Sequence, residues 1–106
     1  MAPSPPSIHH VGQWFESAEG VLVMPRVIDL AMNYGYVVPE DDRVDIAQVE
    51  QGDNDEDLIE HVIFIADSAV RFLNKTVIRD PRIAFGWHEG DLYLWPMTWW
   101  RNKLAG

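Results

Sequence analysis

The sequence contains no cysteine. A disulfide framework, a thiolate nucleophile and a thiolate-bound metal are therefore excluded, and a reducing compartment suits such a chain. The sequence also lacks an uninterrupted apolar run of about 18 residues, which argues against a membrane-spanning helix. The opening stretch MAPSPPSIHH has neither the basic block nor the apolar block of a secretory signal peptide, so we expect a cytoplasmic protein.

Basic residues are scarce. Eight Lys and Arg stand against 17 Asp and Glu, which gives a formal net charge of −9 and an isoelectric point near 4.6. A charge of this sign opposes binding to a nucleic-acid backbone or to an anionic membrane surface. We therefore expect a basic protein as partner, with no direct contact to nucleic acid and no membrane association.

Length and composition predict one small domain of the α+β class. The chain has 106 residues, of which 47% are hydrophobic and 24% are charged, values that are typical of a globular domain. Residues 1–8 contain three prolines and two serines, a composition that favours an extended chain, so we expect a flexible tail there. Residues 9–106 then form the single domain.

The first half of the chain predicts a hairpin followed by a short helix. Short apolar segments on either side of Ser17–Gly20 predict two antiparallel strands at about 13–24. Pro25 suits the first turn of a helix, and apolar residues then recur at helical spacing as far as Gly35. We therefore expect a short helix at about 25–34.

The clearest helical pattern covers residues 55–74. Its apolar residues form more than one stripe and are unbroken from Val62 to Ala66, so we expect a central helix that is covered on more than one side. The acidic and amide residues at 53–57 just before it suit the start of a helix, where they cap free backbone N–H groups. On the polar face, His61 lies within reach of Asp57, four residues earlier.

A second antiparallel hairpin is predicted at about 82–96. If Glu89 and Gly90 form a two-residue turn, both strands alternate consistently. That register pairs Phe85 with Leu94, Trp87 with Leu92, Ala84 with Trp95, and Gly86 with Tyr93. A four-residue loop at 88–91 is the alternative, and it would shift the register. Pro96 then ends the strand, and the Trp-containing residues after it are expected to form a helical turn over the core.

The dominant electrostatic feature is the stretch from Glu40 to Glu60, in which Arg43 is the single basic residue. It predicts a surface that occupies the basic groove of a partner by imitating a line of phosphates. The candidate partner-binding acids are Glu40, Asp41, Asp42, Asp45, Asp53 and Asp55. The alternative is a solvated acidic loop that keeps the protein soluble and caps the central helix. Independently of both readings, Val44, Ile46 and Val49 suggest a short helix before Gly52. A calcium loop beginning at Asp53 is excluded, since Leu58 and Phe64 occupy its glycine and glutamate positions.

Tryptophan is unusually frequent, with five residues in the chain. Trp95, Trp99 and Trp100 lie close together in the sequence, and Trp is enriched in the energetic centres of protein interfaces. We therefore add these three residues to the candidate partner-binding set. Two alternatives stay open, namely that the rings serve as core material, or that they close a homodimer.

Polar residues at the tip of the second hairpin suggest a different kind of function. His88, Glu89 and Asp91 are residue types that bind zinc or manganese or transfer protons, so a small metal-dependent or acid/base enzyme is the alternative hypothesis. No HExxH, GxSxG or phosphate-binding glycine motif accompanies them. We therefore predict no catalytic residues, no metal site and no cofactor.

Residues 66–74, which end in Leu73-Asn74, and the hairpin FGWHEGDLYLWP at 85–96 resemble small proteins encoded by bacteriophages and other mobile elements. In these proteins a helix ending near Leu-Asn precedes an aromatic hairpin. The resemblance implies no activity, cofactor or catalytic residue. It implies a context, because small acidic proteins of such genomes often block basic surfaces of host defence or nucleic-acid enzymes. The first functional hypothesis is therefore a non-enzymatic inhibitor of that kind.

Overall fold

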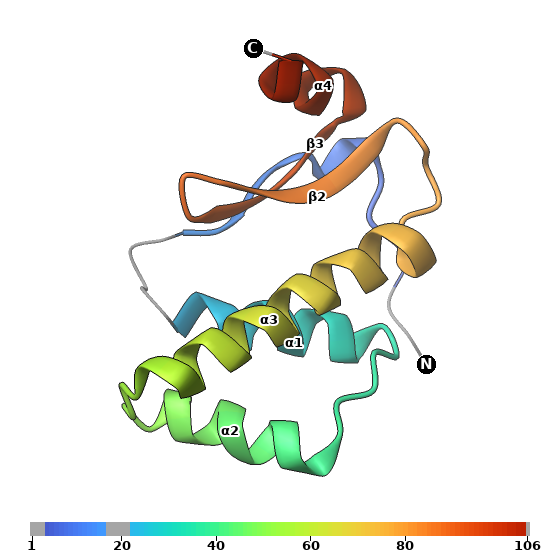
Figure 1. The fold of residues 1–106 in the computed structure, drawn as a ribbon. Helices are drawn as coiled ribbons and strands as arrows, with labels where there is room; N and C mark the ends of the chain where they lie inside the picture. The colour runs from blue at the N-terminus through green and yellow to red at the C-terminus, as the bar shows by residue number, and fades with distance from the viewer. Residues whose placement is uncertain (1–3, 17–21, 106) are drawn as a thin grey trace.

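The computed structural model describes residues 4–16 and 22–105. The chain forms three layers, with one helix on one face of a three-stranded antiparallel sheet and the remaining long helices on the other face (Figure 1). The elements are η1 (Ile8–His10), β1 (Gly12–Phe15), α1 (Val23–Asn33), α2 (Glu40–Glu50), α3 (Glu56–Phe72), η3 (Leu73–Val77), β2 (Ile83–His88), β3 (Asp91–Pro96) and α4 (Met97–Ala105). The α+β class predicted from the sequence is confirmed.

The hairpin of β2 and β3 has the predicted register. All four predicted cross-strand pairs are present, from Ala84 opposite Trp95 to Trp87 opposite Leu92. Glu89 and Gly90 form the turn with φ values of 54° and 84°, because a two-residue turn that follows the twist of the strands needs positive φ at both positions. The alternative four-residue loop is therefore wrong.

The first predicted hairpin is wrong in its second strand. Val23 and Met24 belong to α1, because Val23 is buried at the start of the stripe that continues with Val27, Ile28 and Ala31. The strand β1 pairs instead with β3, far along the chain, so that the sheet order is β1-β3-β2. The loop that was expected between the two strands falls at residues 17–21, outside the described part of the chain.

The helix α3 is the central element, as predicted. It packs against α1 and α2, and its Val62, Ala66 and Ala69 are fully buried. After Phe72 the helix widens into the π-turn η3, whose Asn74 amide both donates to the Phe85 carbonyl oxygen at 2.9 Å and accepts from the Phe85 N–H at 2.7 Å. Because β2 is an edge strand, these two bonds occupy backbone groups that would otherwise be open to another strand.

The segment expected to be a flexible tail is in contact with the domain from Ser4 onward. The Tyr34 hydroxyl donates to the Ser4 carbonyl oxygen at 2.9 Å, and Pro6 is buried. Ser7 caps the short helix η1 through its hydroxyl. Proline reduces the conformational freedom that the segment loses on ordering, which favours its ordered position against the domain.

The helix α4 lies on the sheet face opposite to α1 and α3 (Figure 1). Its Trp100 indole N–H donates to the Ala84 carbonyl oxygen at 2.9 Å, and the ring lies directly over Gly86. The helical turn expected after Pro96 is therefore a longer helix that covers the outer face of the sheet. In the described part of the chain, no helix combines the length and the apolar character needed to cross a membrane.

Candidate functional site

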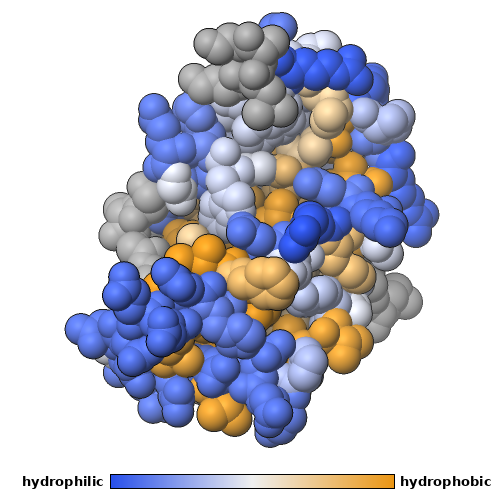
Figure 2. Space-filling model, viewed as in Figure 1, coloured by the Kyte–Doolittle hydropathy of each residue, from blue (hydrophilic) through white to orange (hydrophobic). Residues whose placement is uncertain are grey.

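The acidic stretch folds into one end of the molecule, formed by α2, the turn after it and the first turns of α3. Figure 2 shows hydrophilic residues covering most of this lower end, while apolar residues gather across the middle of the molecule. The helix α2 is attached mainly by Ile46 and Val49, which are buried, whereas Val44 on the same helix is half exposed. The short helix expected before Gly52 is thus confirmed, although its apolar spacing is poor because only these two residues face the core.

The six acids predicted to bind a partner have three different surroundings. Asp55 caps α3, since its carboxylate accepts the Leu58 N–H at 3.0 Å, and Asp53 accepts the Asp55 N–H at 3.0 Å. These two residues therefore have a structural task, as the sequence predicted for the start of this helix. Asp42 and Asp45 face His61, while Glu40 and Asp41 are exposed in the first turn of α2.

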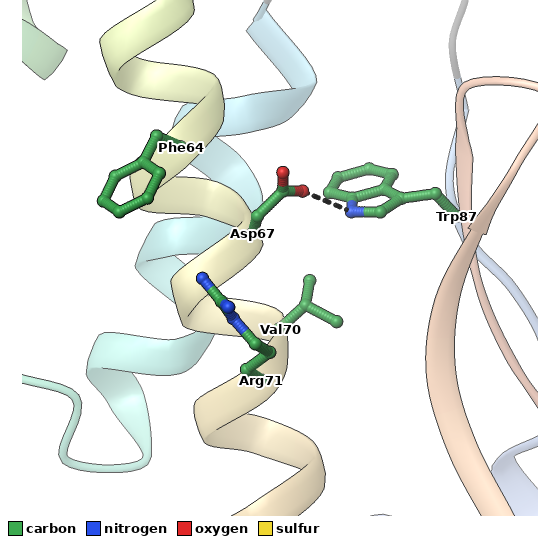
Figure 3. A pocket seen from close by; sticks show the side chains of 5 residues that line it. All are labelled: Phe64, Asp67, Val70, Arg71 and Trp87. Atoms are coloured by element: carbon green, nitrogen blue, oxygen red, sulfur yellow. Dashed lines mark hydrogen bonds between the residues drawn. The ribbon is translucent and has the colours of Figure 1, made fainter.

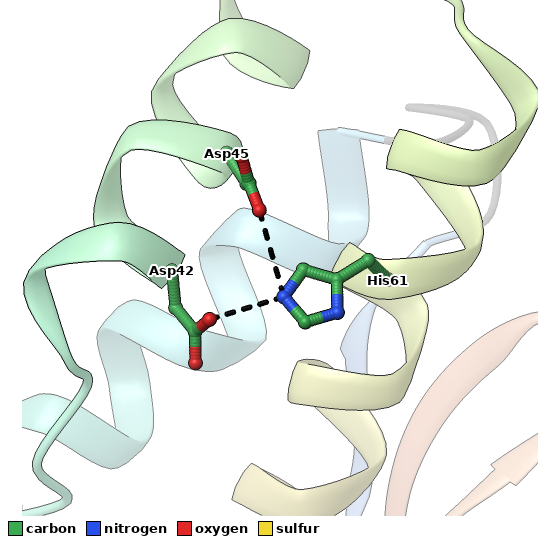
Figure 4. Close-up of side chains that lie close together, drawn as sticks. All are labelled: Asp42, Asp45 and His61. Atoms are coloured by element: carbon green, nitrogen blue, oxygen red, sulfur yellow. Dashed lines mark hydrogen bonds and ion pairs between the residues drawn. The ribbon is translucent and has the colours of Figure 1, made fainter.

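Asp42, Asp45 and His61 form a compact cluster between two helices (Figure 4). His61 Nε2 lies 3.0 Å from Asp42 Oδ1 and 3.5 Å from Asp45 Oδ2. The side chains are 42%, 28% and 34% exposed for His61, Asp42 and Asp45, so ions and water can reach them. The expected contact of His61 with Asp57 is replaced by this one, because α2 packs alongside α3 and places its carboxylates closer to the ring.

A second set of acids at this end is exposed and has no ion-pair partner among residues 4–16 and 22–105. We call this set the acidic surface. Its members are Glu40, Asp41 and Glu50 on α2, and Glu56, Asp57 and Glu60 on α3. The one base nearby, Arg43, donates its Nε–H to the Val38 carbonyl oxygen at 3.1 Å. Several of these acids also stabilise the positive ends of the α2 and α3 dipoles.

The three Trp residues of the predicted binding set lie at the opposite end of the molecule. Trp95 stacks on Tyr93 with ring centroids 3.9 Å apart, and Trp99 lies 3.5 Å from Trp95. Trp99 and Trp100 meet edge to face at 4.9 Å. The helix α4, which carries Trp99 and Trp100, is separated from α2 by the sheet and by the layer of α1 and α3 (Figure 1). The acids and the Trp residues therefore belong to two separate parts of the surface.

At the hairpin tip, the side chains of His88, Glu89 and Asp91 do not converge on one point. His88 Nε2 lies 3.9 Å from Glu89 Oε2, while Asp91 accepts a hydrogen bond from the Gln13 side chain at 2.8 Å. The His88 ring is enclosed by aromatic rings, with Trp99 at 5.3 Å between centroids. Within the described residues, the only group of three or more His, Asp or Glu ligand atoms that converge is the cluster of Asp42, Asp45 and His61.

A shallow groove of about 340 Å³ lies between α3 and the tip of β2 (Figure 3). A hydrogen bond joins its two sides: the Trp87 indole N–H on β2 donates to the Asp67 carboxylate on α3 at 3.0 Å. Phe64 lines its outer side and is 62% exposed, although the sequence pattern placed it within an unbroken apolar run. The other lining residues are Val70 and Arg71.

Comparisons with protein-family models, with curated proteins and with solved structures found no match. The resemblance to phage and mobile-element proteins thus stays a prediction.

Proposed function

We propose that this protein is a non-enzymatic interaction protein that binds a basic protein through its acidic surface. The observation that supports the proposal is the position of six exposed carboxylates without ion-pair partners, within the described residues, at one end of the molecule. The helix dipoles account for the acids in the first turns of α2 and α3, but not for Glu50 and Glu60, and the mutual repulsion of all six destabilises the compact state. A basic partner relieves that repulsion and releases bound counterions.

The proposed partner is a protein with a basic groove, such as a host enzyme that handles nucleic acid or takes part in defence. Charge complementarity of this kind speeds association and makes it sensitive to salt. The proposal includes a cytoplasmic setting, for which the cysteine-free sequence is the support. Blocking the partner's groove would be the whole activity, so no residue is assigned a catalytic role.

The structure changes which substitutions can test this proposal. Replacing Asp53 or Asp55 removes a backbone cap, and replacing Asp42 or Asp45 disturbs the contact with His61. The informative variant is Glu40→Gln/Asp41→Asn/Glu50→Gln, because these exposed side chains form no ion pair or side-chain hydrogen bond with any of residues 4–16 and 22–105. The matched control neutralises the exposed Glu16 and Asp29 together with the turn residue Glu89.

The wild-type protein and both variants are immobilised, and a lysate of the source cell is passed over each at about 50 mM and about 300 mM salt, a range across which screening of surface charge increases markedly. We expect a basic protein that is retained at low salt by the wild type and the control and is lost from the acidic-surface variant. Equal retention by all three would contradict the charge mechanism. Concentration-dependent sedimentation of the wild type alone would favour the homodimer closed by the Trp residues.

A further inference from the structure

We propose that Asp42, Asp45 and His61 bind one divalent transition-metal ion such as zinc, and that this ion links α2 to α3. This inference is independent of the proposed partner, because it rests on donor atoms that the acidic surface does not include. The cluster supplies one imidazole nitrogen and two carboxylate oxygens, and the three donor atoms lie within 4.8 Å of one another. No spacing motif in the sequence marks it.

The distances suit ligands that share one ion. Zinc lies about 2.0–2.1 Å from a histidine nitrogen and about 2.0–2.2 Å from a carboxylate oxygen. Two such ligands are then about 3.0 Å apart at a right angle and about 3.4 Å apart at the tetrahedral angle. His61 Nε2 lies 3.0 Å from Asp42 Oδ1 and 3.5 Å from Asp45 Oδ2, so each carboxylate lies at the distance from the imidazole nitrogen that two ligands of one ion have.

The backbone holds the donors in place before an ion arrives. Asp42 and Asp45 are three residues apart on α2 and therefore share one face of that helix. Ile46, next to Asp45, is buried against the core, and so is Val62, next to His61. Donors on two packed helices lose less freedom on binding than donors on loops, which favours affinity.

Charge and donor type select the ion. Within residues 4–16 and 22–105, no Lys or Arg forms an ion pair with Asp42 or Asp45, so a divalent ion offsets two negative charges that otherwise face one imidazole. The exposed acids nearby raise the local cation concentration. An imidazole donor favours zinc, cobalt, nickel or copper over calcium and magnesium, which prefer oxygen ligands alone. Three protein ligands leave at least one coordination position open.

The test is calorimetric titration of the metal-free protein with zinc chloride, and in parallel with magnesium chloride. We expect saturable binding of one zinc ion, a higher melting temperature in its presence and no comparable binding of magnesium. His61→Gln and Asp42→Asn should each weaken zinc binding by about tenfold or more, since loss of even a supporting outer group typically costs 10–100-fold. The matched control is His9→Gln/His10→Gln, which removes the exposed N-terminal histidines and should leave the affinity unchanged.

Circular dichroism establishes that each variant is folded. If a variant fails to fold, the test is made on the wild-type protein by measuring the ¹⁵N chemical shifts of the His61 ring with and without zinc. Zinc binding should shift the Nε2 resonance strongly. Zinc affinity that is unchanged in His61→Gln, equal binding of magnesium, or an unshifted His61 ring would each overturn the proposal. The capture experiment above is unaffected by His61→Gln if the two proposals are separate, because the acidic surface stays intact.

Discussion

The substitution Gly86→Ala tests whether Trp100 of α4 is packed against the sheet and is therefore not available to bind a partner. A Cβ atom at Gly86 would lie 2.8 Å and 2.9 Å from two carbons of the Trp100 six-membered ring. Real Cβ atoms do not approach carbon so closely, so the Trp100 ring must shift away from the strand, against the hydrogen bond that holds its indole to the Ala84 carbonyl oxygen. Overpacking of this kind costs about 1–3 kcal/mol. Alanine is otherwise favoured over glycine inside a strand by about 0.5–1 kcal/mol. The difference of the two central values is a net destabilisation of about 1 kcal/mol.

Once the Trp100 indole is removed, we expect Gly86→Ala to raise the stability instead of lowering it. In the background of Trp100→Leu, which keeps an apolar side chain but removes the ring over Gly86, Gly86→Ala should stabilise the protein by about 0.5–1 kcal/mol. The coupling free energy is then about 2 kcal/mol, well above the departure of about 0.3–0.5 kcal/mol found for independent sites.

Urea unfolding of the four proteins, followed by far-ultraviolet circular dichroism, measures this coupling. Circular dichroism is needed because the Trp100 substitution changes the fluorescence of the protein. If Gly86→Ala has the same effect in both backgrounds, the ring does not rest on Gly86. Trp100 would then be available to a partner, and its packing against Gly86 would be wrong.

Three further predictions concern stability. Asp55→Ala should lower the unfolding free energy by about 1 kcal/mol in urea titrations, because α3 loses its N-cap, and an unchanged midpoint would contradict the capping role. Asn74→Ala should cost about 1–3 kcal/mol and speed hydrogen exchange at the Phe85 amide, which loses its acceptor; continued protection there would argue against the paired hydrogen bonds between the Asn74 side chain and the Phe85 backbone. Hydrogen bonds from the Arg82 side chain, and then from its backbone, lower the pKa of Asp80 from 3.8 to about 2. This stabilisation is therefore complete above about pH 4 and is lost as pH falls towards 2, so Asp80→Asn should remove that part of the acid dependence, as NMR-monitored acid titration of both proteins can check.

The elements that the sequence predicted well are those stabilised by near neighbours. The helix α3 has a long apolar pattern and an acidic cap, and the β2–β3 hairpin has a turn that permits one consistent alternation of side chains. Helix α2 was harder to predict, because only Ile46 and Val49 are buried and its acids are compatible with a helix or a loop. Its position against α3 was outside the reach of any local pattern.

The candidate site, too, was predictable where it depends on local sequence and unpredictable where it depends on tertiary packing. The charge of the acidic stretch is visible in the sequence, but the sorting of its carboxylates into caps, His61 contacts and an exposed surface depends on how α2 packs. Asp42 and His61 lie 19 residues apart on two helices, so no spacing rule brings them together. The groove beside Phe64 was missed because an apolar run of this kind is typical of a buried helix face.

By itself, the sequence determined the acidic charge, the central helix, the second hairpin and its register, since these depend on composition and on contacts a few residues apart. The tertiary structure alone decided that β1 pairs with β3, that α4 covers the outer face of the sheet, and that the acids and the Trp residues lie at opposite ends. These outcomes depend on contacts between distant parts of the chain, where burial of the whole core outweighs local preference.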